Sequence, residues 1–102
     1  MAFVTVATVG EVPPGQGKQV TVSGKTLALF NLNGTYYAID DDCPHSGGPL
    51  SEGQLHGHEV TCPWHDARFD VTTGKHLCPP ARRDVACYKV QVVGEDVQVD
   101  VN

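Results

Sequence analysis

The sequence predicts an all-β fold, and three observations support this prediction. Apolar side chains alternate with polar or small ones at both ends of the chain, with the period of two that a strand gives. The dipeptide Asn33-Gly34 stands between two such runs, and Asn-Gly is the strongest short-range signal of a β-hairpin. The 102 residues include 11 glycines and 7 prolines, which favours many turns, and no window carries the apolar stripe of a helix.

The N-terminal part of the chain predicts four strands. Residues 3–9, FVTVATV, alternate β-branched with small or polar side chains. Residues 18–40 predict three more strands, because Ser23-Gly24-Lys25 and Asn33-Gly34 interrupt the alternation with turn residues. Both central positions of a two-residue hairpin turn take positive φ, which asparagine and glycine tolerate best.

The middle of the chain differs from both ends. From Asp40 to about Pro80 the alternation breaks up, and glycines and prolines become frequent. Short strands are predicted there only at residues 59–62 and 68–71. We therefore expect a loop-rich unit, and loops held by a rigid scaffold are a common place for chemistry.

The C-terminal residues 87–101 predict a second hairpin, with Gly94-Glu95-Asp96 as its connection. The chain is therefore expected to form one domain whose β base is built from both ends and holds the loop-rich unit between them. The expected boundaries are 1–102 for the domain, about 1–39 and 82–102 for the base, and about 40–81 for the inserted unit.

Composition excludes several classes of function. The net charge of −5 argues against nucleic-acid binding, which needs a basic face, and weakly against anionic membrane surfaces. It is compatible with docking onto basic surfaces of partner proteins. No stretch approaches the roughly 20 apolar residues of a membrane span, and the N-terminus lacks the features of a secretion signal. We expect a soluble, cytoplasmic monomer.

Two Cys/His pairs stand out in the inserted unit. They are Cys43-Pro44-His45 and Cys62-Pro63-Trp64-His65, and 16 residues separate His45 from Cys62. The four cysteines of the chain could form disulfides in three pairings, but a reducing cytoplasm favours metal binding.

The spacing of these pairs discriminates between metals. Structural zinc typically uses pairs of like ligands at C-x2–4-C and H-x3–5-H spacing, which the order Cys, His, Cys, His does not match. The C-x-x-C-H of haem attachment is absent. Cys78 and Cys87 lack the short spacings of four-cysteine clusters. What remains is a [2Fe-2S] cluster with two Cys on one iron and two His on the other.

The two pairs, with the flanking residues 52–75 and the CPPA at 78–81, resemble those of a Rieske-type ferredoxin of the low-potential, oxygenase-associated type. The resemblance covers nearly the whole chain. It implies a Rieske-like β-sandwich or barrel base with a cluster-binding subdomain and one [2Fe-2S] cluster. It also implies that Cys43 and Cys62 hold the inner iron, while His45 and His65 hold the outer iron near the surface.

The resemblance also implies a function. The chain would be a one-electron carrier and not an enzyme, with a flavoprotein NAD(P)H reductase as donor and a terminal Rieske non-haem iron oxygenase, often ring-hydroxylating, as acceptor. The sequence has no G-x-G-x-x-G or flavin signature, so we expect no direct hydride transfer from NADH. The alternative is a small subunit or relay module of a larger reductase, such as nitrite reductase. A redox sensor is a third, weaker hypothesis.

Departures from the family indicate the reduction potential. Rieske proteins of respiratory chains carry an extra cysteine in each ligand loop, where this chain has Gly48 and Trp64, so no such bridge is implied. They also carry a serine and a tyrosine that donate hydrogen bonds to the cluster sulfurs, where this chain has Ala67 and Phe69. With fewer donors, and with Asp40–Asp42 and Asp66 nearby, we expect a potential of about −150 mV or somewhat below.

The other residues that stand out in the sequence are expected to have no part in binding the metal, apart from a possible cover by Trp64. Cys78 and Cys87 are expected to be ordinary thiols, and Asp40–Asp42 a solvated turn, with a docking role as the alternative. Trp64 is expected either to cover the cluster or to form a docking surface. The other histidines are expected at the surface without a ligand role: His56, His58 and His76.

Overall fold

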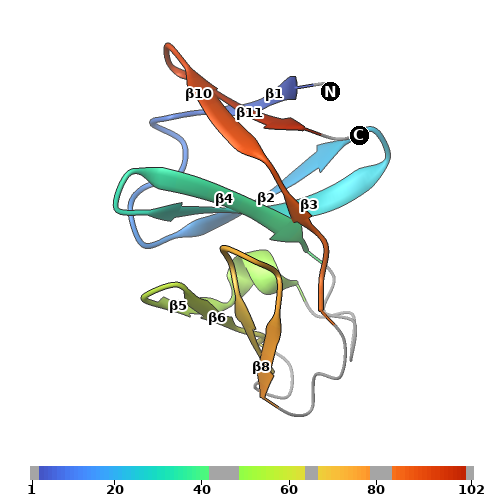
Figure 1. Ribbon diagram of the computed structural model, residues 1–102. Coiled ribbons are helices and arrows are strands. Elements are labelled where there is room, and N and C mark those ends of the chain that lie inside the picture. The colour runs from blue at the N-terminus through green and yellow to red at the C-terminus, as the bar shows by residue number, and fades with distance from the viewer. Residues whose placement is uncertain (1–2, 42–48, 64–66, 79–83, 101–102) are drawn as a thin grey trace.

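The computed structural model describes residues 3–41, 49–63, 67–78 and 84–100. Within these residues the regular structure consists of eleven strands and one short 3-10 helix, η1, at Leu50–Glu52, which confirms the all-β prediction. All strand pairs are antiparallel, and they form three sheets. The sheets lie in three tiers, with the middle one between the other two (Figure 1).

The first tier joins the two ends of the chain. Its strand order is β1-β11-β10, with β1 at Phe3–Thr8, β10 at Val90–Val93 and β11 at Asp96–Asp100. Phe3 pairs with Asp100, so the two ends of the described chain lie side by side. A register shift between Thr5 and Ala7 marks a bulge in β1.

The middle tier carries the predicted hairpins. Its order is β2-β3-β4-β9, with β2 at Gly17–Val22, β3 at Lys25–Leu32, β4 at Thr35–Asp40 and β9 at Cys87–Tyr88. The turns between β2, β3 and β4 have the positive φ angles expected of them, at Ser23 (51°), Gly24 (76°), Asn33 (55°) and Gly34 (95°).

Strand β3 is buried on both faces, which a simple alternation does not predict. Leu27 and Leu29 pack into one hydrophobic cluster with Val97 and Val99 of the first tier. The alternate residues of β3, together with Ile39 of β4, pack into a second cluster with the third tier. A sheet that lies between two others has no face exposed to solvent. The residues that point to either face of its central strand are therefore mostly apolar.

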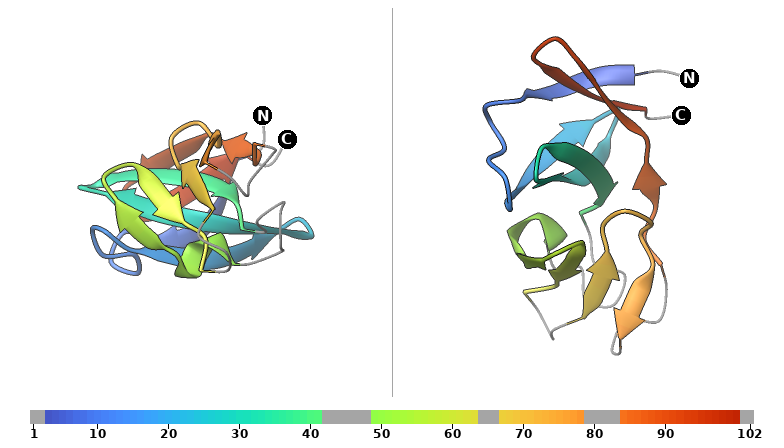
Figure 2. Two further views of the ribbon diagram at one scale, coloured as in Figure 1. Left: turned by 90° about the horizontal axis from the view of Figure 1, so that it is seen from below. Right: turned by 60° about the vertical axis from the view of Figure 1, so that its left-hand side comes forward.

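The third tier is the small sheet of the inserted unit (Figure 2). Its order is β5-β6-β7-β8, with β5 at Gln54–His56, β6 at Glu59–Thr61, β7 at Arg68–Asp70 and β8 at His76–Cys78. The sequence predicted β6 and β7 but missed β5 and β8, although all four have three residues. The predicted strands centre on Val60 and Phe69, which favour strands, whereas the missed ones centre on Leu55 and Leu77, which give no such signal.

The C-terminal hairpin differs from its prediction in two ways. Its loop is the two-residue Gly94-Glu95, because Val93 pairs directly with Asp96. Cys87 and Tyr88 do not belong to this hairpin, since they pair with Ile39 and Ala38 in the middle tier. The segment 87–93 therefore runs from one sheet into another and ties the two together.

Candidate metal centre

Of the four predicted ligands, the structure describes Cys62. This residue directly follows β6 and is fully buried, with 0% of its surface exposed. It belongs to the cluster that joins the middle and third tiers. The positions of Cys43, His45 and His65 lie outside the described residues, so the structure does not show the four ligands together.

A tight hairpin presents the second ligand segment. The backbone N–H of Cys62 donates to the carbonyl of Ala67, with an N–O distance of 2.6 Å. Next to this bond, Thr61 of β6 pairs with Arg68 of β7. Residues 63–66, which include His65, therefore connect two strand ends that are held together.

The first ligand segment has anchored ends as well. The backbone N–H of Leu50 donates to the carbonyl of Asp41 (2.7 Å), and that of Ser51 donates to the Asp41 carboxylate Oδ1 (2.8 Å). The second carboxylate oxygen accepts a hydrogen bond from Gln19 Nε2 (2.7 Å). Asp41 is buried, with 1% of its surface exposed.

Asp40 makes the corresponding contacts toward the C-terminal part of the chain. Tyr88 donates its hydroxyl to Asp40 Oδ1 (2.7 Å), and the Ala86 N–H donates to Oδ2 (3.2 Å). Burial of Tyr88, together with this hydrogen bond and the carboxylate charge, raises the pKa of Tyr88 to about 12. Asp40 thus bonds to the start of the C-terminal part of the chain, while Asp41 bonds to η1 and to β2.

The expectation of a solvated acidic turn is therefore wrong for Asp41, which is buried. Asp40 is half-buried and is the last residue of β4, while Asp42 lies outside the described residues. Sequence reasoning missed both residues as anchors. The signal that could have found them is their position at the end of a predicted strand. Successive residues of a strand point to opposite sides, so two consecutive acids there cannot lie on the same face.

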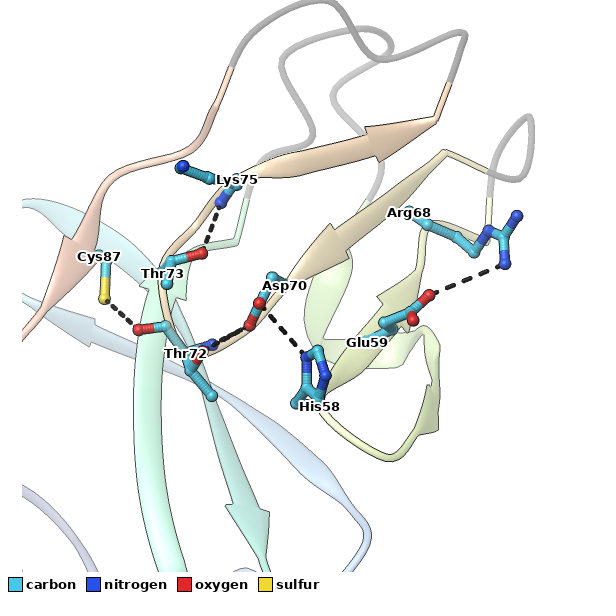
Figure 3. A network of polar contacts seen from close by, with 8 residues as sticks. All are labelled: His58, Glu59, Arg68, Asp70, Thr72, Thr73, Lys75 and Cys87. Atoms are coloured by element: carbon cyan, nitrogen blue, oxygen red, sulfur yellow. Dashed lines mark hydrogen bonds and ion pairs between the residues drawn. The ribbon is translucent and has the colours of Figure 1, made fainter.

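A polar network joins the turns of the third tier and reaches Cys87 of β9 (Figure 3). Thr72 donates from its backbone N–H (2.8 Å) and its hydroxyl (2.6 Å) to Asp70 Oδ1, and His58 Nδ1 lies 3.3 Å from Oδ2. Burial raises the pKa of Asp70, but the hydrogen bonds from Thr72 and the nearby His58 outweigh it, so the pKa is lowered overall. The carboxylate thus joins the turns that follow β5 and β7.

The predicted surface histidines are exposed, as expected, and two of them have acidic partners. His56, His58 and His76 are all exposed. His76 Nδ1 lies 2.6 Å from Asp84 Oδ1, and the His76 backbone N–H donates to the same oxygen (3.0 Å). The hydrogen bond from the His76 backbone N–H, followed by that of the His76 ring, lowers the pKa of Asp84.

Cys87 is an exposed cysteine that lies away from Cys62 in the fold. Its Sγ donates to the carbonyl of Thr72 at 3.5 Å. Partial burial, with the charge of Asp70 in addition, raises the pKa of the Cys87 thiol. A raised pKa leaves less of the thiol as the thiolate, which is the form that binds metals. The side chains of Cys78 and Trp64 lie outside the described residues.

The described residues fit a cluster whose thiolate side is buried. Leu50, Val60, Ala67 and Phe69 are fully buried and share a hydrophobic cluster with Cys62. None of them carries a hydroxyl, so none can donate a hydrogen bond from its side chain to a cluster sulfur. In the described part of the chain, no group of three or more His, Cys, Asp and Glu side chains could hold a separate metal ion.

The buried Cys62 thiol and the anchored ends of the two Cys/His segments suit the protein part of a small iron–sulfur protein. The model of the Rieske [2Fe-2S] domain matches residues 2–89, and the chain belongs to this family. It binds a [2Fe-2S] cluster and is an electron carrier and not a catalytic enzyme. This confirms the resemblance and the cofactor predicted from the sequence.

Individual relatives match the chain over nearly its full length. It is 39% identical over 100 residues to the ferredoxin component of the naphthalene 1,2-dioxygenase system from Pseudomonas aeruginosa, covering 98% of this chain and 96% of that one. The structure is similar to the ferredoxin of carbazole 1,9a-dioxygenase from Nocardioides aromaticivorans IC177, with a TM-score of 0.92, 33% identity and 97% coverage of both chains.

A third similarity is to a complex. The chain resembles a chain in the complex of reduced oxygenase and oxidized ferredoxin in carbazole 1,9a-dioxygenase, with a TM-score of 0.89 and 31% identity. The match covers 95% of this chain and 91% of that chain. In the described part of this protein, no helix has the length and apolar character that crossing a bilayer requires.

Proposed function

We propose that this chain is the ferredoxin component of a dioxygenase system. It accepts one electron at a time from a flavoprotein NAD(P)H reductase and delivers it to a terminal Rieske non-haem iron oxygenase of the ring-hydroxylating type. The observation that carries the proposal is the likeness, over 98% of this chain, to a relative whose name states that role. A similar chain occurs in a complex of ferredoxin with oxygenase, which supports the acceptor.

The proposal assigns the cluster to four side chains. Cys43 and Cys62 hold the inner iron, and His45 and His65 hold the outer iron, one Cys and one His from each segment. The burial of Cys62 supports this assignment, because a soft, strongly bonded thiolate suits the interior. The neutral imidazoles suit the outer position, because their second nitrogen can face solvent or a partner.

When bound, the [2Fe-2S] cluster supplies storage for a single electron. The chain's own residues bind it and keep water from its thiolate side, since Leu50, Val60 and Phe69 are buried in the same hydrophobic cluster as Cys62. Ala67 and Phe69 offer no hydroxyl hydrogen bonds to sulfur, and few such bonds correspond to a low potential. We expect a midpoint of about −150 mV or somewhat below.

The proposal also covers organisation and location. The chain acts as a monomeric, single-domain protein in the cytoplasm, with a base of about residues 1–39 and 82–102 and a cluster-binding subdomain of about 40–81. The net charge of −5 favours docking partners with basic surfaces.

The experiment is electron transfer to a purified terminal oxygenase. The protein is reduced with dithionite, freed of excess reductant, and mixed anaerobically with the oxidised oxygenase of a naphthalene dioxygenase system. We expect the oxygenase to be reduced in proportion to the ferredoxin added. In a second arm, NADH and the flavoprotein reductase replace dithionite, and product formation is expected to depend on the ferredoxin concentration.

A Cys62→Ser variant treated in the same way is the matched control and is expected to transfer no electrons. If the cluster-loaded protein reduces no ring-hydroxylating oxygenase but reduces a sirohaem nitrite reductase, the proposed partners are wrong and the small-subunit alternative is supported.

A further inference from the structure

We propose that Asp41 is a positioning residue of the metal centre, whose buried carboxylate joins the two ends of the first ligand segment and places a fixed negative charge beside Cys43. This inference rests on the proposed ligand set. It concerns a residue that is neither a ligand nor exposed to a partner, since only 1% of its surface is accessible.

The first step is the closure of the segment. The chain leaves the middle tier at Asp41 and returns at η1, after the residues that contain Cys43 and His45. The carbonyl of Asp41 accepts from the Leu50 N–H (2.7 Å), and its Oδ1 accepts from the Ser51 N–H (2.8 Å). One residue thus binds two consecutive N–H groups at the far end of the segment and fixes the distance between its ends.

The second step is the attachment of this closure to the rigid base. Asp41 Oδ2 accepts from Gln19 Nε2 of β2 (2.7 Å), and the Asp41 N–H donates to the carbonyl of Thr26 at the start of β3 (3.1 Å). Strand β2 can approach η1 closely because position 17 is glycine. A Cβ there would lie 2.6 Å from Phe30 Cε1 and 3.0 Å from the carbonyl of Ser51. The segment ends are therefore held by two strands and one 3-10 helix.

The third step is the charge. Both oxygens of the Asp41 side chain accept from N–H donors, so the group acts as an acceptor only, as a carboxylate does. Among the described residues no Lys, Arg or His forms an ion pair with it.

The Cα atoms of Asp41 and Cys43 are two residues apart and so at most about 7 Å from each other, and the carboxylate lies roughly 2–3 Å from its own Cα. The charge is therefore within about 10 Å of the Cα of Cys43. A buried negative charge at that range disfavours adding an electron, and it therefore lowers the midpoint potential.

The first test is the Asp41→Asn variant, which keeps the shape and removes the charge. Ser51 can still donate to Oδ1, and Gln19 can turn its amide to accept from the new Nδ2. We expect full iron content and an unchanged visible spectrum, with a midpoint potential higher than that of the wild type in protein-film voltammetry. The control is Asp96→Asn at the exposed β10–β11 turn, which makes the same change of charge at the far tier and is expected to leave the midpoint unchanged.

The second test is the Asp41→Ala variant, which also removes the side-chain bonds to Ser51 and Gln19. We expect its cluster to be lost to an iron chelator at least ten times faster than the wild-type cluster, at a temperature where circular dichroism shows the fold intact. Val97→Ala is the control, because it makes a cavity in the other hydrophobic cluster and loosens the fold without touching the segment.

The proposal is overturned if Asp41→Asn has the wild-type midpoint, or if Asp41→Ala releases iron no faster than Val97→Ala. Either result leaves the proposed function unaffected, provided that the wild-type protein carries its cluster and reduces the oxygenase. A wild-type protein that binds no iron and sulfide overturns both.

Discussion

Cys62 lies in apolar surroundings at the end of the β6–β7 hairpin. Its backbone N–H is fixed to Ala67, and its neighbours in the hydrophobic cluster include Leu50, Val60 and Phe69. Ordinary core packing would account for the burial alone, but not for a second Cys/His pair at 43 and 45 in the other segment. The residue scale therefore supports a ligand role for Cys62.

The Cys62→Ser variant tests this role. We expect the visible absorption of the cluster to be absent and the thermal unfolding temperature to fall, because a serine oxygen is a poor replacement for thiolate and the bound cluster stabilises the fold. Absorption spectra and calorimetry measure both effects. Cys87→Ser is the matched control and is expected to keep the wild-type spectrum, since Cys87 is exposed and bonded to Thr72. A coloured, stable Cys62→Ser protein would contradict the assignment.

The Tyr88–Asp40 contact gives a prediction at alkaline pH. The pKa of Tyr88 is about 12 in the folded protein, above the roughly 10 of a free tyrosine. The folded state therefore favours the protonated phenol, so this contribution to stability is complete below about pH 10 and is lost as pH rises through about 12. Urea unfolding between these pH values should show this loss in the wild type.

The Tyr88→Phe variant should lose less stability than the wild type over the same window. At neutral pH we expect it to be less stable by about 1 kcal/mol, the usual value of one hydrogen bond. Parallel pH profiles for the two proteins would contradict this account.

The sequence singles out residues whose chemistry is unusual but does not reveal those whose role depends on position. Cys43, His45, Cys62 and His65 stand out because Cys and His at short spacing are rare. Asp40 and Asp41 look like a solvated run, because nothing local reveals that one contacts Tyr88 and the other Ser51. These contacts join residues 48 and 10 positions apart, and only the tertiary fold brings them together.

At the scale of elements, glycine allows the inserted unit to pack closely against the base. Gly74 lies in the turn between β7 and β8 with φ of 81°, and a Cβ there would lie 2.2 Å from the carbonyl of Val85. The same turn is held by the hydrogen bond from the Val85 N–H to the Gly74 carbonyl (2.8 Å). This contact connects the third tier to the segment that precedes β9.

We expect Gly74→Ala to lower the free energy of unfolding by about 3–4 kcal/mol, because the new methyl group displaces the backbone of Val85. Gly94→Ala is the control, since Gly94 also has a positive φ, of 62°, but nothing lies within 4 Å of its Cβ position. Its cost should be only about 1 kcal/mol, from the positive φ. Urea unfolding of both variants measures the difference, and equal costs would contradict the close packing.

Strands and turns were predicted correctly where turn residues or strand-favouring residues mark them, and were missed where neither is present. Asn33-Gly34 identified the β3–β4 hairpin because few residues tolerate two successive positive φ angles. Strands β5 and β8 are as short as β6 and β7, but they centre on Leu55 and Leu77 and lack the β-branched or aromatic residue that marks the other two. The assignment of Cys87 and Tyr88 to the middle tier depends on pairing with β4, which no local pattern indicates.

At the scale of the whole molecule, the two hydrophobic clusters share the middle tier. Ala28, Phe30 and Ile39 of the base pack with Leu50 and other residues of the inserted unit, while Leu27 and Leu29 pack toward the first tier. The inserted unit therefore has no hydrophobic core of its own among the described residues, which favours unfolding as a single cooperative unit.

We expect urea to bleach the visible absorption and abolish the far-UV circular dichroism in one coincident transition. Phe30→Ala should shift both probes to lower urea together, with a loss of about 3–5 kcal/mol, because Phe30 is fully buried between the tiers. Bleaching well before the loss of circular dichroism would instead indicate an insert that unfolds by itself.

The central claim is that thiolates and imidazoles share one two-iron cluster, and electron paramagnetic resonance of the dithionite-reduced protein tests it most directly. The account predicts a signal from one reduced [2Fe-2S] cluster per chain, with an average g value below that of clusters bound by four cysteines. A silent spectrum from fully metallated protein, or the average g value of a four-cysteine cluster, would contradict it.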